Sequence, residues 1–161
     1  MAEPRTVNMR VDGRTRTGVA EPRLLLADFL RRELGLTSVH VACEQGGCGA
    51  CTVRLDGRLA LSCLVLAVQA DDCEIQTAAV LASGGDLHPI QQAFRAKHGL
   101  QCGYCTPGML LATQVLLEVT PEPTEAEIRE HLAGNVCRCT GYTGIVASVR
   151  EASRLMLEER S

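Results

Sequence analysis

The sequence contains no tryptophan and only two tyrosines and two phenylalanines. Hydrophobic residues nevertheless make up 46% of it, so a buried core must be built from leucine, valine, isoleucine and alanine. An excess of one charge sign is also absent, because 16 lysines and arginines stand against 19 aspartates and glutamates. The chain also has no long basic run that could bind the phosphates of a nucleic acid, so we expect no nucleic-acid partner.

Long hydrophobic runs are missing as well. No apolar run approaches the ~18 residues that a membrane-spanning helix needs, so no membrane span is expected. The N-terminus, M-A-E-P-R-T-V-N, has neither the apolar segment of a secretory signal nor a twin-arginine signal. We therefore expect a globular protein of the cytoplasm, with one medium domain or two small ones in its 161 residues.

Cysteine is the residue that this sequence has in excess, with nine copies. Disulfides do not persist in a reducing compartment, so a disulfide framework is not expected. The odd number would also leave one thiol over. We therefore interpret the cysteines as metal ligands or redox groups.

The first half of the sequence predicts a small sheet around one helix. Strands are predicted over residues 7–11, 14–19, 52–55 and 73–77, with hairpin turns at Asp12-Gly13 and Asp56-Gly57. Apolar residues at helical spacing predict a helix over 24–34, ended by Gly35, and a short helix over 61–68.

The second half reads as helical. Helices are predicted over 88–98, 106–119 and 143–159, with one more after the capping box that begins at Thr124. The segment Ser83–Asp86 separates the two patterns. The sequence therefore predicts an α+β protein with two domains, residues 1–82 and 83–161.

Four cysteines of the first half follow the pattern C-x4-C-x2-C-x11-C: Cys43, Cys48, Cys51 and Cys63. The first three have the spacing with which plant-type ferredoxins hold a 2Fe–2S cluster. Gly46, Gly47 and Gly49 let the loop curl and bring backbone N–H groups to the cluster sulfurs. Zinc sites more often have two C-x2-C pairs and need no glycine-lined loop, so the pattern favours iron–sulfur over the zinc alternative.

Four cysteines of the second half follow the pattern C-x2-C-x31-C-x-C: Cys102, Cys105, Cys137 and Cys139. Each pair comes just before a predicted helix. Two helix N-termini would then face one anionic cluster and lower the pKa values of the thiols. Spacing alone also suits zinc, so both interpretations stay open for this group.

The chain resembles the small iron–sulfur subunits of the molybdenum hydroxylases, the xanthine oxidase and carbon monoxide dehydrogenase-like family. The matching segments are C-E-Q-G-G-C-G-A-C-T at 43–52, Cys63, G-L-Q-C-G-Y-C-T-P-G-M at 99–109 and G-N-V-C-R-C-T-G-Y at 134–142. They run in order along nearly the whole chain. The resemblance implies an N-terminal β-grasp domain of the plant-type 2Fe–2S ferredoxin kind. It implies that a C-terminal four-helix bundle holds a second 2Fe–2S cluster on the second group of cysteines.

The resemblance also implies a function, that of the electron-transfer subunit of a hydroxylase or dehydrogenase. Electrons would leave a molybdenum–pterin cofactor on a large subunit and pass through the second and then the first cluster. They would end on FAD in a medium subunit, within a heterotrimer or a dimer of heterotrimers. Gln101 and Cys139 would contact the pterin. Catalysis would take place on the large subunit, so no catalytic residue is expected here, and an N-heteroaromatic, carbon monoxide, a purine or an aldehyde are candidate substrates.

Two other kinds of function fit the cysteines. One is a free two-cluster ferredoxin, for which a more strongly acidic chain than a net charge of −3 is expected. The other is a zinc-stabilised interaction module, which would be colourless where 2Fe–2S proteins are red-brown. Cys73, the ninth cysteine, is predicted to be a small buried apolar residue of a strand.

Overall fold

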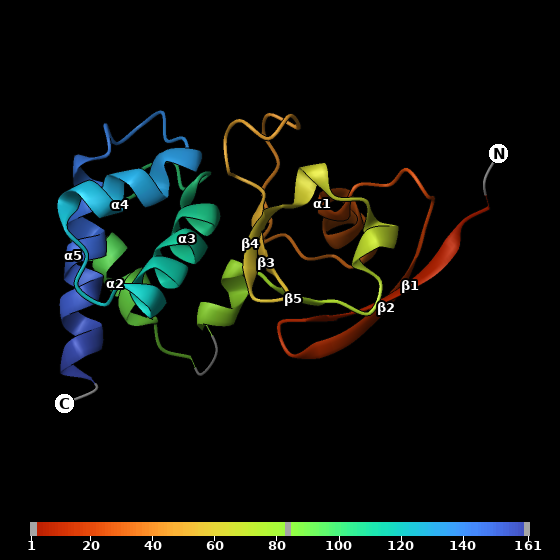
Figure 1. Cartoon of the computed structure of the whole chain (residues 1–161), viewed down its shortest axis with the longest axis horizontal. Helices are drawn as coiled ribbons and strands as arrows, with labels where there is room; N and C mark the ends of the chain where they lie inside the picture. Colours follow the sequence, from red (N-terminus) through yellow and green to blue (C-terminus); the bar gives the residue numbers. More distant parts are fainter. Residues whose placement is uncertain (1–2, 83–84, 160–161) are drawn as a thin grey trace.

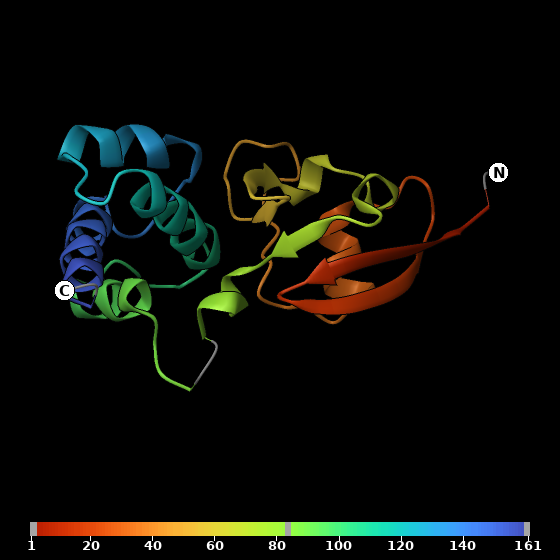
Figure 2. The same cartoon turned by 60° about the horizontal axis from the view of Figure 1, so that its bottom comes forward.

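The computed structural model describes residues 3–82 and 85–159, which form two parts side by side (Figure 1). We call residues 3–77 the sheet half and residues 85–159 the helical half. In Figure 2 the same two parts are seen from another direction, again side by side. The predicted boundary at 83–86 falls partly on Ser83 and Gly84, which lie outside the described residues.

The sheet half contains a mixed five-stranded sheet in the order β2-β1-β5-β3-β4. Its strands are β1 (Arg5–Val11), β2 (Arg14–Ala20), β3 (Thr52–Leu55), β4 (Arg58–Leu61) and β5 (Glu74–Gln76). β1 runs parallel to β5, and the other neighbouring strands are antiparallel. Both predicted hairpins form, because Asp12-Gly13 and Asp56-Gly57 take the positive φ angles that these tight turns require.

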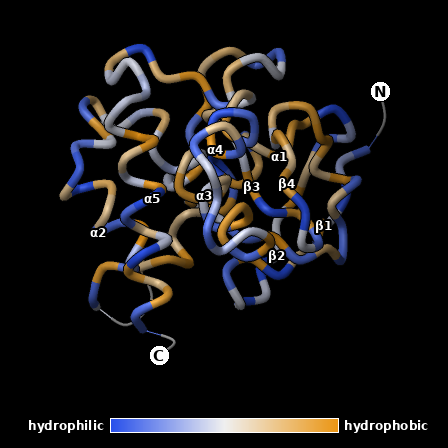
Figure 3. Tube along the Cα trace, turned by 60° about the vertical axis from the view of Figure 1, so that its left-hand side comes forward, coloured by the Kyte–Doolittle hydropathy of each residue, from blue (hydrophilic) through white to orange (hydrophobic). Residues whose placement is uncertain are grey.

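Buried and exposed side chains alternate along β1, and the buried ones form part of the core of the sheet half. Val7, Met9 and Val11 are buried, whereas the residues between them are exposed. The buried side chains belong to one apolar cluster with Phe29 and Leu30. Figure 3 shows that hydrophobic and hydrophilic residues are interleaved along the trace. The sheet with its covering helix, followed by helices, gives the α+β class that the sequence predicted.

The helix predicted over 24–34 is present in an altered form. It comprises α1 (Leu26–Asp28) and a π turn at Phe29–Glu33. Leu25 stays extended because it pairs with Leu66 in an isolated β-bridge. Gly35 has the positive φ of 69° that was expected of the residue ending this segment.

The prediction of a helix over residues 61–68 is wrong. Leu61 is the last residue of β4, and two 3₁₀ turns follow it, at Ser62–Leu64 and Ala67–Ala70. Leu66 between the two turns is extended, since the bridge to Leu25 engages its backbone. Pairing of Leu66 with Leu25, 41 residues earlier, thus overrides the local apolar spacing.

The four predicted helices of the second half are all present: α2 (Pro89–Ala96), α3 (Thr106–Val119), α4 (Glu125–His131) and α5 (Thr143–Glu158). The predicted capping box opens α4, because the Thr124 hydroxyl accepts from Glu127 N and the Glu127 carboxylate accepts from Thr124 N. A 3₁₀ turn at Ala78–Ala82 leads from the sheet to these helices, and its Leu81 is buried in their core. No helix in the described part of the chain has the length and apolar character that a membrane crossing requires.

The two halves meet along β3 and α3. Arg54 of β3 and Glu118 of α3 form an ion pair through two contacts, at 2.8 and 2.7 Å. At one end of this contact the carbonyl oxygen of Gly49 accepts from Asn135 Nδ2 at 3.1 Å. A Cβ atom on Gly108 would lie 2.3 Å from the same oxygen. The first turn of α3 can therefore approach the sheet half this closely only with glycine at residue 108.

We predict that Gly108→Ala destabilises the protein by about 1–3 kcal/mol, as overpacking usually does. The apparent thermal midpoint of the purified protein, followed by circular dichroism, should fall by roughly 2–4 °C per kcal/mol. Gly134→Ala is the matched control, because a Cβ atom at Gly134 would meet nothing within 4 Å. Equal midpoints for the two variants would contradict the close contact described here.

Candidate functional site

The first cysteine group lies in a loop that curls back on itself. Glu44, Gly46 and Gly49 have positive φ angles of 53°, 80° and 69°. This curl turns backbone N–H groups toward the Cys43 thiol. The N–H of Gln45, the Cys48 thiol and further amides of the loop lower the pKa of Cys43 to about 6. The loop therefore favours a thiolate at this end.

The hairpin of β3 and β4 brings Cys63 back to Cys51. Cys51 immediately precedes β3, and its carbonyl oxygen accepts from Ser62 N at 3.2 Å and from Ser62 Oγ at 2.7 Å. Both thiol residues are buried. Burial raises the pKa of Cys51 to about 11, and the adjacent Cys63 thiol adds to this. The first group is thus arranged as two pairs of thiols, Cys43 with Cys48 and Cys51 with Cys63.

The second cysteine group also meets in pairs. The sulfurs of Cys102 and Cys139 lie 3.5 Å apart and are exposed. Cys105 faces Cys137, which is buried. Residues that the sequence separates by more than thirty positions are therefore brought together as predicted.

The predicted lowering of the thiol pKa values at the helix N-termini is wrong for Cys105, the N-cap of α3. Burial raises its pKa to about 12, with a further contribution from the Cys137 thiol. Burial would also raise the pKa of Cys137, but the Thr140 hydroxyl and nearby backbone N–H groups bring it below its usual value. Burial therefore decides the direction of the pKa shift at Cys105, and hydrogen bonds decide it at Cys137.

Direct hydrogen bonds join the two cysteine loops. Val136 N donates to the carbonyl oxygen of Cys48 at 2.9 Å, immediately before Cys137. Asn135 Nδ2 donates to the carbonyl oxygen of Gly49, the residue that follows Cys48. A ligand candidate of one group is therefore linked to a ligand candidate of the other through one peptide unit and one hydrogen bond.

A second contact between the groups involves His40 and Tyr104. His40 Nδ1 lies 2.7 Å from the carbonyl oxygen of Tyr104, and Tyr104 Oη donates to Val41 O at 2.5 Å. The two rings are packed with their centroids 4.8 Å apart. Sequence reasoning missed these contacts and the role of Asn135, because no spacing rule relates residues that far apart. The only available signal was their position within three residues of a cysteine.

The remaining predicted residues have distinct positions. Gln101 is exposed and directly precedes Cys102, so it lies on the same surface as the exposed pair Cys102 and Cys139. Cys73 lies just before β5, half-buried against the sheet core, with Asp71 O as a neighbour of its thiol. Across residues 3–82 and 85–159, no three His, Cys, Asp or Glu side chains converge on one point that could hold a single metal ion.

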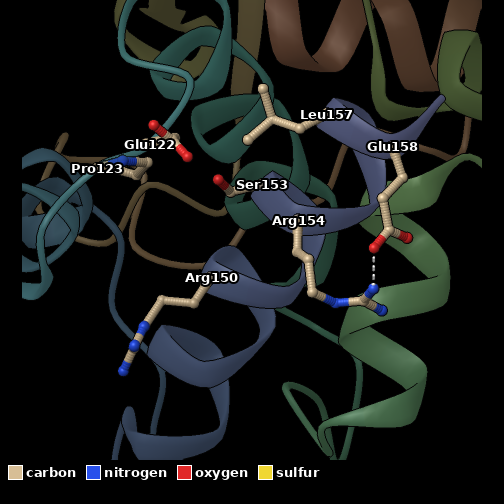
Figure 4. A pocket seen from close by; sticks show the side chains of 7 residues that line it. All are labelled: Glu122, Pro123, Arg150, Ser153, Arg154, Leu157 and Glu158. Atoms are coloured by element: carbon tan, nitrogen blue, oxygen red, sulfur yellow. Dashed lines mark hydrogen bonds and ion pairs between the residues drawn. The ribbon is translucent and has the colours of Figure 1, made fainter. Parts of the chain in front are cut away.

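A hollow of about 340 Å³ on the helical half is not part of either cysteine group (Figure 4). It lies between α5 and the segment before α4, and Arg154 in its wall pairs with Glu158 at 2.5 Å. Its lining residues are Glu122, Pro123, Arg150, Ser153, Arg154, Leu157 and Glu158. None of these is a thiol, so the chemistry of the chain is to be sought at the cysteines.

Two family models match the chain. A 2Fe-2S iron-sulfur cluster binding domain matches residues 9–82, and a 2Fe-2S binding domain matches residues 77–150. The first match contains Cys43, Cys48, Cys51 and Cys63, and the second contains the four cysteines of the other group.

Curated relatives and a solved structure cover nearly the whole chain. The caffeine dehydrogenase subunit gamma of Pseudomonas sp. (strain CBB1) is 48% identical over 91% of this chain and 90% of its own. The nicotinate dehydrogenase small FeS subunit of Eubacterium barkeri is 46% identical over 91% of this chain and 94% of its own. A chain of quinoline 2-oxidoreductase from Pseudomonas putida 86 is 40% identical, with a TM-score of 0.93 over 99% of this chain and 100% of that one. This chain therefore belongs to the small iron–sulfur subunits of the molybdenum hydroxylase family.

Proposed function

We propose that this protein is the electron-transfer subunit of a molybdenum hydroxylase and that its eight paired cysteines hold two 2Fe–2S clusters. The ligands of the first are Cys43, Cys48, Cys51 and Cys63, and those of the second are Cys102, Cys105, Cys137 and Cys139. When bound, such clusters supply one-electron transfer. The division into domains 1–82 and 83–161, of the β-grasp and four-helix-bundle kinds, belongs to the same proposal.

The donor set fits this cofactor. A 2Fe–2S cluster has two irons that each need two thiolates, and the thiols of each group meet two by two. The first loop also supplies the inward backbone N–H groups that favour negatively charged sulfur. A single tetrahedral zinc ion would instead need four thiolates around one point. The pairing therefore favours iron–sulfur over the zinc alternative.

The observation that carries the proposed function is the hydrogen bond from Val136 N to Cys48 O. The protein's part in cofactor chemistry is to position the redox centres relative to each other. This bond ties the loop of one proposed centre to the segment that carries the other.

The surface around the cysteines has the apolar character expected of a surface that binds partner subunits. Exposed apolar side chains stand beside both groups: Leu64 beside the first, and Leu100, Tyr104 and Val136 beside the second. We infer that the exposed pair Cys102 and Cys139, with Gln101, faces the pterin of a large molybdenum subunit. The first cluster would then face FAD on a medium subunit, in a heterotrimer or a dimer of heterotrimers. A free ferredoxin has no need of such an apolar surround.

The substrate we propose for the complex is an N-heteroaromatic compound. The relatives described above are named for caffeine, nicotinate and quinoline, all of which contain an aromatic ring nitrogen. The substrate would bind to the large subunit, and this chain would only remove electrons. The cytoplasmic location inferred from the N-terminal sequence stays a prediction.

We predict that the purified protein contains about four irons and four labile sulfides per chain and gives two distinguishable EPR signals after reduction. Cys51→Ser should abolish one signal and Cys137→Ser the other, because each removes a buried ligand. Cys73→Ser is the control and should keep all of the iron. Zinc in place of iron, or iron loss in the control variant, would contradict the ligand assignment.

We predict that Val136→Asp weakens binding to the molybdenum subunit by at least about tenfold, because it places a charge in an apolar contact. The side chain of Val136 is 48% exposed, so the isolated chain should still load its iron. Val119→Asp is the matched control. Val119 is 79% exposed and is the last residue of α3, at the opposite end of this helix from Cys105. Calorimetric titration with the partner subunit measures both, and equal affinities would contradict the assigned surface.

A further inference from the structure

Thr140 directly follows the second cysteine group and points its hydroxyl at one of the sulfurs. Thr140 Oγ1 lies 3.2 Å from Cys137 Sγ, within hydrogen-bond reach for a sulfur acceptor. Cys137 is buried, whereas Cys139, two residues later, is exposed. A half-buried side-chain hydroxyl therefore lies within hydrogen-bond distance of a ligand sulfur of the proposed cluster.

The direction of this hydrogen bond is fixed by its surroundings. The backbone N–H of Tyr142 donates to Thr140 Oγ1 at 3.2 Å, so that oxygen already accepts one hydrogen bond. The single hydroxyl proton is left for Cys137 Sγ. The backbone N–H of Cys137 cannot take over this task, because it donates to Tyr142 Oη at 2.9 Å.

A donor aimed at a ligand sulfur favours the reduced state of a cluster. Reduction adds one electron and raises the negative charge on the sulfurs, which strengthens each hydrogen bond that they accept. The hydroxyl keeps its proton throughout, so only an electron moves. The effect is larger in a buried place, where the local dielectric is low.

We propose that Thr140 raises the reduction potential of the cluster on Cys102, Cys105, Cys137 and Cys139 through its hydrogen bond to Cys137 Sγ. The inference rests on the proposed function, because it requires a cluster at these residues. Thr140 would act through its contact with the ligand Cys137 and would set how readily this centre accepts an electron. The centre nearer to the proposed molybdenum partner would thereby be tuned separately from the one on the first loop.

The test is an EPR redox titration of the loaded chain for the wild type and three variants. Thr140→Val keeps the shape and removes the hydroxyl, whereas Thr140→Ser keeps the hydroxyl. Ser148→Ala is the matched control, because it removes a hydroxyl of α5 that bonds Gly144 O at 2.7 Å and no sulfur. The signal of this cluster is identified as the one lost in Cys137→Ser.

In T140V the equilibrium constant for reducing this cluster should fall about tenfold, which is ~59 mV for a one-electron couple. The T140S and S148A variants should keep the wild-type midpoint, and the other cluster should not shift in any variant. An unchanged midpoint in T140V, with both clusters present, would overturn this inference alone.

A purely structural role for Thr140 gives a different pattern. If T140V loses the iron of this site, Thr140→Ala is titrated in its place, with the same expected shift. Loss of iron from both variants while T140S loads fully would also overturn the inference, because Thr140 would then serve assembly. Absence of two 2Fe–2S signals in the wild type would refute the proposed function itself, which separates that failure from the others.

Discussion

The arrangement of this protein depends on the hydrogen bond between the backbone of Val136 and the carbonyl oxygen of Cys48. It joins the loop that carries one cysteine group to the segment that carries the other. The bond can form because Gly49 and Gly108 leave no side chain between the halves, so Asn135 reaches the carbonyl oxygen of Gly49. The relative position of the two thiol groups is therefore set by one main-chain hydrogen bond together with the side-chain contact of Asn135 beside it.

The electrostatics of the thiols explain why the protein and its metal depend on each other. Burial raises the pKa of Cys51 to about 11 and that of Cys105 to about 12, so these thiols are protonated near neutral pH without a metal. Metal binding to a thiol releases its proton, and the charge of the metal then compensates the buried thiolate. The amides around Cys43, whose pKa is about 6, provide a thiolate from which loading can begin. The first group thus combines a thiol that is ready to bind, Cys43, with a buried one, Cys51, that binding must deprotonate.

The sequence predicted much of this organisation. Both hairpins and all four helices of the second half were predicted from turn residues, capping and apolar spacing, which act over short distances. The helix over 61–68 was predicted wrongly because Leu66 pairs with Leu25, a contact that no local pattern encodes. The grouping of the cysteines followed from their spacing and neighbours. Their pairing and the bridges made by Asn135, His40 and Tyr104 did not, because these arise from how two separately patterned halves dock.

The central claim is that the chain holds two redox centres close enough to act as one relay. Low-temperature EPR of the loaded chain tests it through the magnetic interaction between two reduced clusters. We expect each signal to broaden or split when both clusters are reduced, compared with samples in which only one is reduced. A fully reduced spectrum equal to the plain sum of two independent signals would contradict the close, fixed separation on which this account depends.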